Sequence, residues 1–395
     1  MVQSHKKKGA PRMRLLCVGG GSGGHVTPVL AVINRLAEID DELQVLFVCD
    51  SAFESQARGL MKHAAVPVKV KTVSAGKLRR YHDESLLQKM IDLKTNSKNA
   101  RDIFRVGVGF MQSLKIMRDY SPDIVFAKGG YVCLPVGLAA QSLHIPLVLH
   151  DSDARPGLTN KVLSRFAAGI ATGTPLKNYN YNPGISTYTG VPVGPEFIKF
   201  SKKEQSDAKK KLGFDIKRPL VVGVGGGLGA MSINKAFVSA GHTLVQKGCS
   251  LLLVSGRAHA DEIRRQMPES QHIRVESFVY SDMHELLGAA DVVVTRASAT
   301  FLQELSALAK PCIVVPAAQL GDQVKNAEVF AAAKAVVVMS DREIVQNENF
   351  TKQVIDLVDS TQKRQQLAKN FHSFAKPNAA KDVADMIYEV TRRGL

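Results

Sequence analysis

The sequence predicts an α/β protein of two domains, each built around a parallel β-sheet of the Rossmann type. Short apolar runs alternate with amphipathic stretches of helical length, as expected when buried strands alternate with helices. The runs lie at residues 15–18, 45–49, 124–127, 146–149, 220–224, 251–254, 291–295 and 312–316. A glycine-rich turn follows the first run of each half. The 395 residues suffice for two domains of about 100–200 residues each.

The boundary between the domains is expected near Gly190–Pro195. The segment 191–219 contains three prolines and a lysine-rich stretch, and no buried strand begins before Pro219 has passed. The chain then repeats its opening order of strand, glycine turn and helix in "RPLVVGVGGGLGAMSINKAF". The predicted division is a basic flexible extension (1–12), an N-terminal domain (13–190), a C-terminal domain (191–375) and a C-terminal helix (376–395) that packs back toward the N-terminal domain.

The composition is that of an ordinary globular protein, with 45% hydrophobic and 22% charged residues. The basic start of the chain is followed by only four apolar residues, which are too few for a secretory signal. The longest apolar-looking span, 132–149, contains polar residues and two prolines, so we expect a buried helix followed by a strand. The five cysteines are far apart, which predicts reduced core thiols and no metal site.

The net charge of +16 is concentrated in one segment. Residues 62–118 carry thirteen Lys or Arg against four Asp or Glu, which suggests a polyanionic partner. Nucleic acid is disfavoured, because the chain has no Trp, only 6% aromatic residues and no nucleic-acid-binding motif. The stretch 101–118 instead interleaves apolar residues with cations, which fits an anionic membrane surface. A helix with its apolar side toward the core fits the same pattern equally well.

The first glycine turn, "GGGSGGHVTP" (19–28), matches the G-x-G-x-x-G pattern of a dinucleotide-binding turn. Asp50 ends the next strand and could bind a ribose, so an NAD-dependent oxidoreductase is one interpretation. His25 argues against it, because a bulky imidazole is unusual where a pyrophosphate must approach. A histidine at a helix N-terminus stays neutral and can accept a proton. A capping or packing role for His25 is the alternative.

Further motifs follow the other strands. In the first half these are "KGGYVCLP" (128–135) and "HDSDARPGLTNK" (150–161). In the second half a strand leads into a helix start at Ala297–Thr300, where backbone amides would bind a phosphate. Glu304, one turn inside, would lie near a ribose diol, although a solvated helix residue is the commoner role. The helix of "GDQVKNAEVF" (321–330) carries Gln323 and Asn326 on one face.

Together, these stretches resemble the MurG family in order and spacing over nearly the whole chain from Met13. The resemblance implies a GT-B fold, in which two Rossmann-like domains with parallel sheets face a deep interdomain cleft. It implies transfer of GlcNAc from UDP-GlcNAc to the undecaprenyl-diphosphate-linked muramyl-pentapeptide, which converts lipid I to lipid II in peptidoglycan synthesis. The donor would bind mainly to the second domain and the acceptor to the first. Such enzymes invert the anomeric centre and use no metal ion and no cofactor.

The resemblance also implies roles for individual residues. His25 would be the general base, and the loop of Ser22, Gly23 and Gly24 would touch the donor sugar or the acceptor diphosphate. The remaining substrate contacts would be Asp153, Asn160, Gly194, Gly227, Phe278 and Val279 (uracil), Ala299 and Thr300 (pyrophosphate), Glu304 (ribose), and Gln323 and Asn326 (GlcNAc hydroxyls).

The basic, apolar segment falls where the family docks on the membrane. The expected docking residues are Lys77, Arg79, Arg80, Phe104, Arg105 and Phe110. The resemblance therefore predicts a peripheral protein on the cytoplasmic face of the cell membrane, with other cell-wall synthesis proteins as further candidate partners and no nucleic acid.

The chain departs from the family pattern at donor contacts. Gly227 and Leu228 stand where the family usually has Ser and Gln, Gly194 replaces an arginine, and Asp153 replaces an amide in the "HEQN" motif. Lys128 or Arg155 could compensate. These departures keep four alternatives open: a transferase with another sugar or acceptor, a UDP-GlcNAc 2-epimerase, the NAD-dependent oxidoreductase, and a non-catalytic protein that binds the lipid-linked precursor.

Overall fold

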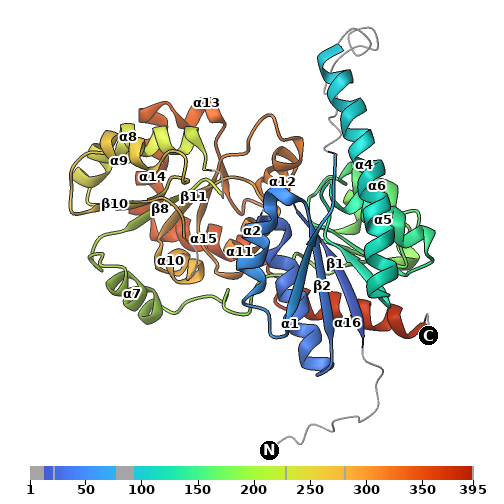
Figure 1. Ribbon diagram of the computed structural model, residues 1–395. Helices are drawn as coiled ribbons and strands as arrows, with labels where there is room; N and C mark the ends of the chain where they lie inside the picture. The colour runs from blue at the N-terminus through green and yellow to red at the C-terminus, as the bar shows by residue number, and fades with distance from the viewer. Residues whose placement is uncertain (1–12, 21–22, 77–92, 227–228, 280–281, 394–395) are drawn as a thin grey trace, which may run out of the picture. The chain divides into compact units, whose positions relative to one another are not determined.

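The computed structural model describes residues 13–20, 23–76, 93–226, 229–279 and 282–393 (Figure 1). The chain forms two compact units. Unit 1 comprises Met1–Ser152, Pro156–Pro192 and Asn378–Leu395, and unit 2 comprises Asp153–Arg155 and Val193–Pro377. Within the described residues, no helix combines the length and the apolar character needed to cross a lipid bilayer.

Unit 1 contains a seven-stranded parallel sheet in the order β3-β2-β1-β4-β5-β6-β7. Its strands are β1 (Arg14–Val18), β2 (Gln44–Cys49), β3 (Val68–Thr72), β4 (Ile124–Ala127), β5 (Leu147–Asp151), β6 (Gly169–Thr172) and β7 (Ser186–Tyr188). Strand β1 has a neighbour on each side, because Leu16 pairs with Leu46 of β2 and with Val125 of β4.

Helices cover both faces of this sheet. Among the described residues of unit 1, the helices are η1 (Gly23–His25), α1 (Thr27–Ile39), η2 (Ser51–Phe53), α2 (Glu54–Met61), α4 (Leu93–Tyr120), α5 (Cys133–Ser142), α6 (Leu158–Leu163), η3 (Leu176–Asn178), η4 (Pro183–Ile185) and α16 (Ala379–Arg393). Since alternate strand residues point to opposite faces, Leu15 and Leu16 enter different hydrophobic clusters. Val383 and Ile387 of α16 join the cluster beneath α1, so the last helix completes the core of unit 1 (Figure 1).

Unit 2 repeats this architecture with a six-stranded parallel sheet in the order β10-β9-β8-β11-β12-β13. Its strands are β8 (Leu220–Val224), β9 (Ser250–Val254), β10 (Ile273–Glu276), β11 (Val292–Thr295), β12 (Cys312–Val314) and β13 (Val337–Val338). Its helices are α7 (Lys202–Lys211), α8 (Met231–Gln246), α9 (Ala260–Gln266), α10 (Met283–Ala289), α11 (Ala299–Ala307), α12 (Gly321–Ala332), α13 (Asp341–Ile344), α14 (Asn347–Asp359) and α15 (Thr361–His372).

All eight strands expected from apolar runs are present, and the span 132–149 is a buried helix followed by a strand, as predicted. The strands that the apolar pattern did not reveal lie toward the edges of the two sheets. In β3 the exposed Lys69 and Lys71 alternate with half-buried and buried valines, and β7 and β13 have three and two residues. Edge strands are covered on fewer sides, so they need no continuous apolar run.

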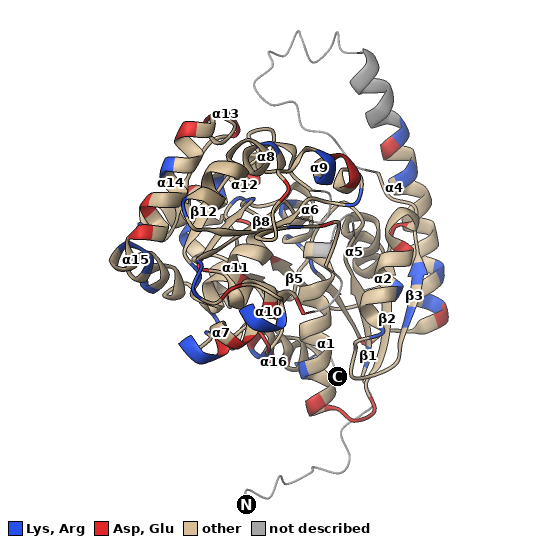
Figure 2. Ribbon diagram, turned by 90° about the vertical axis from the view of Figure 1, so that its left-hand side faces the viewer, with Lys and Arg blue, Asp and Glu red and all other residues tan. Residues whose placement is uncertain are grey.

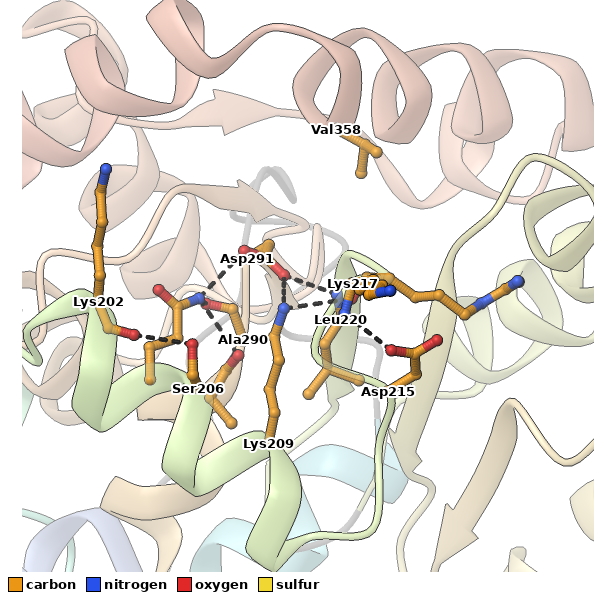
Figure 3. A network of polar contacts seen from close by, with 12 residues as sticks. Lys202, Ser206, Lys209, Asp215, Lys217, Leu220, Ala290, Asp291 and Val358 are labelled. Carbon is orange, nitrogen blue, oxygen red and sulfur yellow. Dashed lines mark hydrogen bonds and ion pairs between the residues drawn. The ribbon is translucent and has the colours of Figure 1, made fainter.

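A polar network holds α7 against the amino-terminal ends of the central strands of unit 2 (Figure 3). One Asp291 carboxylate oxygen accepts hydrogen bonds from Lys209 Nζ at 2.6 Å and from the Leu220 amide at 2.8 Å. The other oxygen accepts a bond from Gln205 Nε2 at 3.1 Å. The helix itself begins with a capping box between Ser201 and Glu204. The network therefore fixes the start of unit 2 from the sheet end opposite the ligand-binding edge expected for this fold.

Candidate functional site

His25 lies in the turn between β1 and α1 of unit 1. The turn leaves the carboxyl end of β1 through Gly19 and Gly20 and closes as the short helix η1, and α1 begins two residues after His25. A side chain at Gly19 would meet the His25 carbonyl oxygen at 2.9 Å. Gly130 of the β4 loop has φ +89°, and a Cβ there would lie 3.6 Å from His25 Cε1. Glycine therefore permits the first turn to close on the His25 backbone, and the left-handed φ of Gly130 lets the β4 loop pass beside the imidazole.

The surroundings of His25 favour its neutral form. Burial and the positive charge of Lys128 lower the pKa of the imidazole to about 4, while a hydrogen bond to the Gly20 backbone opposes this shift. A neutral imidazole at physiological pH can accept a proton, which is the property that a general base requires. Gly23 and Gly24 precede it in the same turn, whereas Ser22 lies outside the described residues.

Lys128 is the second notable group at this edge of the sheet, although its side chain is only 2% exposed. It directly follows β4, and its Nζ donates a hydrogen bond to Ser152 Oγ. Ser152 Oγ also lies 3.3 Å from His150 Nδ1, and His150 Nε2 lies 2.9 Å from the Gly190 carbonyl oxygen. Burial, and then the Lys128 charge, hold the His150 pKa well below its usual range. Lys128 thus lies inside unit 1 with its ammonium on Ser152.

Asn160 of α6 carries a buried acceptor at the same edge. Its side-chain oxygen has no hydrogen-bond partner, and its Nδ2 would lie 3.2 Å from a Cβ on Gly129. Asp50, at the end of β2, also has a buried oxygen, Oδ2, without a partner. Buried acceptors that lack a partner are costly, so both are candidates for ligand contacts.

Unit 2 repeats the strand, turn and helix arrangement. The turn between β8 and α8 includes Gly226 and Gly229, with φ +82° and +78°, and Gly227 lies outside the described residues. After β11 the chain passes through Arg296, Ala297 and Ser298 into α11, which starts at Ala299 as expected. The Ser298 hydroxyl makes no capping hydrogen bond. The positive end of the α11 dipole is therefore suited to an anion.

Glu304 is half-buried, one turn inside α11. Burial, together with the negative charge of Glu196, raises the pKa of the Glu304 carboxyl to about 8. Glu196 folds over Gly194, where a Cβ would approach its carboxylate oxygens to 2.3 Å. Phe278 and Val279 follow β10 and are half-buried, and the Arg257 guanidinium lies 4.7 Å from the centre of the Phe278 ring.

Gln323 and Asn326 both lie on α12 and both hold neighbouring loops. Gln323 Oε1 accepts a hydrogen bond from the Ala317 amide at 3.1 Å. Asn326 Nδ2 donates to the Ala297 carbonyl at 3.0 Å and to Asp153 Oδ1 at 2.8 Å, and its oxygen accepts from the Ala154 amide at 2.8 Å. Asp153 thus bonds to the Asn326 side chain, which the family resemblance assigns to the GlcNAc hydroxyls. A bound sugar would have to compete with the present hydrogen bonds of Asn326.

The expected docking residues separate on α4. Phe104 is 72% exposed and Arg105 is exposed beside it, whereas Phe110 is half-buried and packs against a hydrophobic cluster of unit 1. Ile103 and Met111 are large exposed apolar residues of the same helix. Lys77, Arg79 and Arg80 lie outside the described residues.

Sequence reasoning missed the polar groups that act through other residues. Ser152, Arg296 and Asp341 were given no role, although Ser152 lies within "HDSDARPGLTNK", because their significance depends on contacts between segments far apart in the chain. The position of Ser152 and Arg296 in the sequence could have marked them as site residues. They directly follow the strands β5 and β11, at the edge where α/β sheets bind ligands.

Comparisons with known proteins agree with this arrangement. Residues 15–172 match the glycosyltransferase family 28 N-terminal domain, and residues 220–384 match the family 28 C-terminal domain. The chain is 32% identical over 345 residues to a UDP-N-acetylglucosamine–N-acetylmuramyl-(pentapeptide) pyrophosphoryl-undecaprenol N-acetylglucosamine transferase of Shouchella clausii, covering 87% of this chain and 88% of that protein. A protein of the same name from Lachnoclostridium phytofermentans is 32% identical and covers 90% and 94%.

Solved structures show the same fold. MurG of Acinetobacter baumannii superposes with a TM-score of 0.69 at 21% identity, covering 96% of this chain and 100% of that one. A UDP-GlcNAc 2-epimerase from Neisseria meningitidis bound to UDP-GlcNAc reaches 0.62 at 12% identity, covering 95% and 100%. At such identities the likeness concerns the fold alone. The sequence relatives, and not these structures, separate a transferase from an epimerase.

Proposed function

The chain belongs to the MurG family of glycosyltransferases, and we propose that it transfers GlcNAc from UDP-GlcNAc to the lipid-linked muramyl-pentapeptide acceptor of peptidoglycan synthesis. The single observation that carries the proposal is the division of chemistry between the units. Unit 1 holds a neutral imidazole at the carboxyl edge of its sheet, and unit 2 presents a helix N-terminus that no serine side chain caps. A base and an anion site are what metal-free sugar transfer needs.

In this mechanism His25 removes the proton from the acceptor hydroxyl as the hydroxyl oxygen attacks the anomeric carbon of GlcNAc. The bond from that carbon to the β-phosphate oxygen breaks, and its electron pair leaves with UDP. Attack from the side opposite the leaving group inverts the anomeric centre. The low pKa of His25 keeps the imidazole unprotonated over the whole neutral range, which is the form that can accept the proton.

The donor would bind along the carboxyl edge of unit 2. The start of α11, at Ala299 and Thr300, would bind the pyrophosphate and stabilise the charge that develops on departing UDP. Glu304 would accept hydrogen bonds from the ribose hydroxyls, and the backbone at Phe278 and Val279 would contact uracil. Gln323 would contact the sugar hydroxyls after giving up the Ala317 amide, and Asn326 after giving up its bonds with Asp153 and Ala154.

The acceptor carries a lipid, so the protein must work at a membrane surface, and α4 offers the surface that fits. Figure 2 shows basic residues interspersed along this helix. Phe104 and Met111 are exposed seven residues apart, hence on one side of the helix, and Arg101 and Arg105 are exposed beside them. Apolar side chains would enter the headgroup region while the cations bind anionic lipids. We place the protein as a peripheral protein on the cytoplasmic face of the membrane.

The departures from the family pattern bear on the donor sugar. Lys128 is buried and its Nζ donates to Ser152 Oγ, so it would have to leave this contact in order to compensate for an altered donor contact. GlcNAc remains the proposed sugar because the sequence relatives named for this transfer are similar over most of both chains.

A coupled assay tests the function. The purified protein is mixed with the lipid-linked acceptor in anionic vesicles and, in parallel, with UDP-GlcNAc, UDP-GalNAc or UDP-glucose, and both UDP release and glycosylated lipid are measured. Of the three sugar nucleotides, we expect only UDP-GlcNAc to give glycosylated lipid. In a separate thermal-shift measurement, we expect UDP to raise the melting temperature of the protein and NAD to leave it unchanged. UDP-GlcNAc converted without acceptor would indicate an epimerase. Stabilisation by NAD and not by UDP would overturn the proposal in favour of an oxidoreductase.

A further inference from the structure

Arg296 is the first residue after β11, and it leads into the loop that starts α11. Its side chain is only 14% exposed. A guanidinium stays charged under all physiological conditions, so a largely buried one requires several acceptors. The contacts of Arg296 therefore reveal which segments it holds together.

Those acceptors come from three other segments of unit 2. Arg296 Nη1 donates to Asp341 Oδ1 at 2.7 Å and to the Val315 carbonyl, at the end of β12, at 3.0 Å. Arg296 Nη2 donates to Ser232 Oγ at 3.1 Å. The Ser232 hydroxyl in turn donates to Asp341 Oδ1 at 2.6 Å, which closes a ring of three side chains. We call Ser232, Arg296 and Asp341 the edge triad.

The members of the edge triad belong to elements that surround the carboxyl edge of the sheet. Ser232 lies in the first turn of α8, immediately after the glycine turn. Asp341 is the first residue of α13, where a capping box between Ser340 and Glu343 fixes the backbone. Burial alone would raise the pKa of Asp341, but hydrogen bonds from Ser232 and Arg296 and the Arg296 charge lower it below its usual value. The carboxylate is therefore ionised and balances the positive charge of the guanidinium.

The loop between Arg296 and α11 needs this support. Ser298 occupies the N-cap position without making a capping bond, so its hydroxyl does not fix the first turn of α11. The loop is held instead at its first two residues, by the Arg296 side chain and by the bond from Asn326 to the Ala297 carbonyl. Such an arrangement fixes the position of the α11 N-terminus without a capping bond from Ser298.

We propose that Arg296 is a positioning residue for the diphosphate of a nucleotide, acting with Ser232 and Asp341 to fix the α11 start and the first turn of α8 as one anion-binding edge. The inference rests on the proposed donor site in unit 2. The guanidinium acts through the loop backbone, so its loss should weaken binding of the diphosphate and leave binding of the nucleoside unchanged. A contribution to folding alone would not distinguish the two ligands.

Titration calorimetry with UDP and with uridine tests this distinction. For Arg296→Met we expect the UDP dissociation constant to rise about tenfold or more, as for the loss of charge-assisted hydrogen bonds, with the uridine constant within about twofold and the stoichiometry unchanged. Asp341→Asn keeps one acceptor and should give a smaller loss in the same direction. Arg342→Met removes the same charge from the exposed neighbouring position and should bind both ligands like the parent.

Three results would overturn the inference. They are UDP binding by Arg296→Met within twofold of the parent, an equal loss of UDP and uridine affinity, and an equal loss in the Arg342→Met control. If circular dichroism shows that Arg296→Met does not fold, the Asp341→Asn variant is the test. An unchanged UDP affinity of that variant would reject the proposed role of the edge triad. A parent protein that binds neither ligand overturns the proposed donor site itself, which is a separate result.

Discussion

The Asp291 network makes a quantitative prediction about the stability of unit 2. Asp291→Ala removes the only carboxylate on Lys209 in the network of Figure 3, and the Lys209 side chain is 7% exposed. The ammonium would then keep the Arg218 carbonyl, 3.2 Å away, and the Leu220 amide would lose its acceptor. Breaking a buried ion pair by removing one partner costs about 3–5 kcal/mol. Because the Asp291 side chain is partly exposed, we expect about 3 kcal/mol.

For a unit of this size, that loss corresponds to a fall in melting temperature of about 6–12 °C. Differential scanning calorimetry measures it, with Asp356→Ala as the matched control, because the ion pair of Asp356 with Lys363 is exposed and should contribute under about 1 kcal/mol. Lys209→Met combined with Asp291→Ala should recover part of the loss, since no unpaired ammonium remains buried. Equal melting temperatures for Asp291→Ala and Asp356→Ala would refute the reasoning.

Three further predictions concern the proposed reaction. His25→Ala should lower kcat about 10²–10⁴-fold with UDP affinity unchanged, as for the loss of a general base, and equal turnover in the assay above would exclude that role. Lys128→Met removes a charge that disfavours the imidazolium, so the His25 pKa should rise from about 4 and the acidic limb of the kcat/KM profile should move to higher pH; a limb that stays in place contradicts the assignment. Phe104→Ser with Met111→Ser should reduce sedimentation with anionic vesicles, whereas Ile39→Ser, which alters an exposed apolar residue of α1, should not; equal sedimentation of all variants would remove α4 as the docking surface.

The fold could be predicted from the sequence because its central strands are buried on both faces. Such strands must be apolar throughout, and each of the eight apolar runs in the sequence forms a strand of the structure. Strands such as β3 and β7 were not predicted, because an edge strand tolerates lysine, serine and threonine. We expected the C-terminal helix to pack back toward the N-terminal domain, although contacts between residues nearly a full chain length apart leave no local pattern in the sequence.

Some residues of the candidate site could also be predicted from local sequence patterns, and others could not. His25 and the α11 start were recognisable because glycine turns and helix starts have local signatures. The roles of Ser152 and Arg296 depend on tertiary contacts with Lys128 and Asp341, so their residue types alone carried no information. Phe110 illustrates the converse, because an apolar residue among cations fits a membrane surface and a core equally well until its packing is seen.

The Gly194 departure and the pKa of Glu304 are two aspects of one structural feature, which leads to a final prediction. A Cβ at Gly194 would collide with the Glu196 carboxylate, so any other residue there would displace the charge that acts on Glu304. With a pKa of about 8, Glu304 is about one-tenth ionised at pH 7, and UDP affinity should increase by up to about tenfold as the pH rises through 8, if the carboxylate accepts bonds from the ribose.

Glu196→Gln should lower the Glu304 pKa, because it removes a neighbouring negative charge while the effect of burial remains. We therefore expect tighter UDP binding at pH 7, by less than the full increase available from ionisation, and a weaker dependence on pH. Calorimetry at several pH values measures both, with Glu262→Gln as an exposed control in the same unit and Glu304→Gln as the variant that should lose the pH dependence. If Glu304→Gln kept the full pH dependence, another group would be titrating and Glu304 would lose its place at the ribose. If Glu196→Gln alone left the profile unchanged, the raised pKa would arise from burial, and the loss of the family arginine at Gly194 would have no electrostatic consequence for the donor.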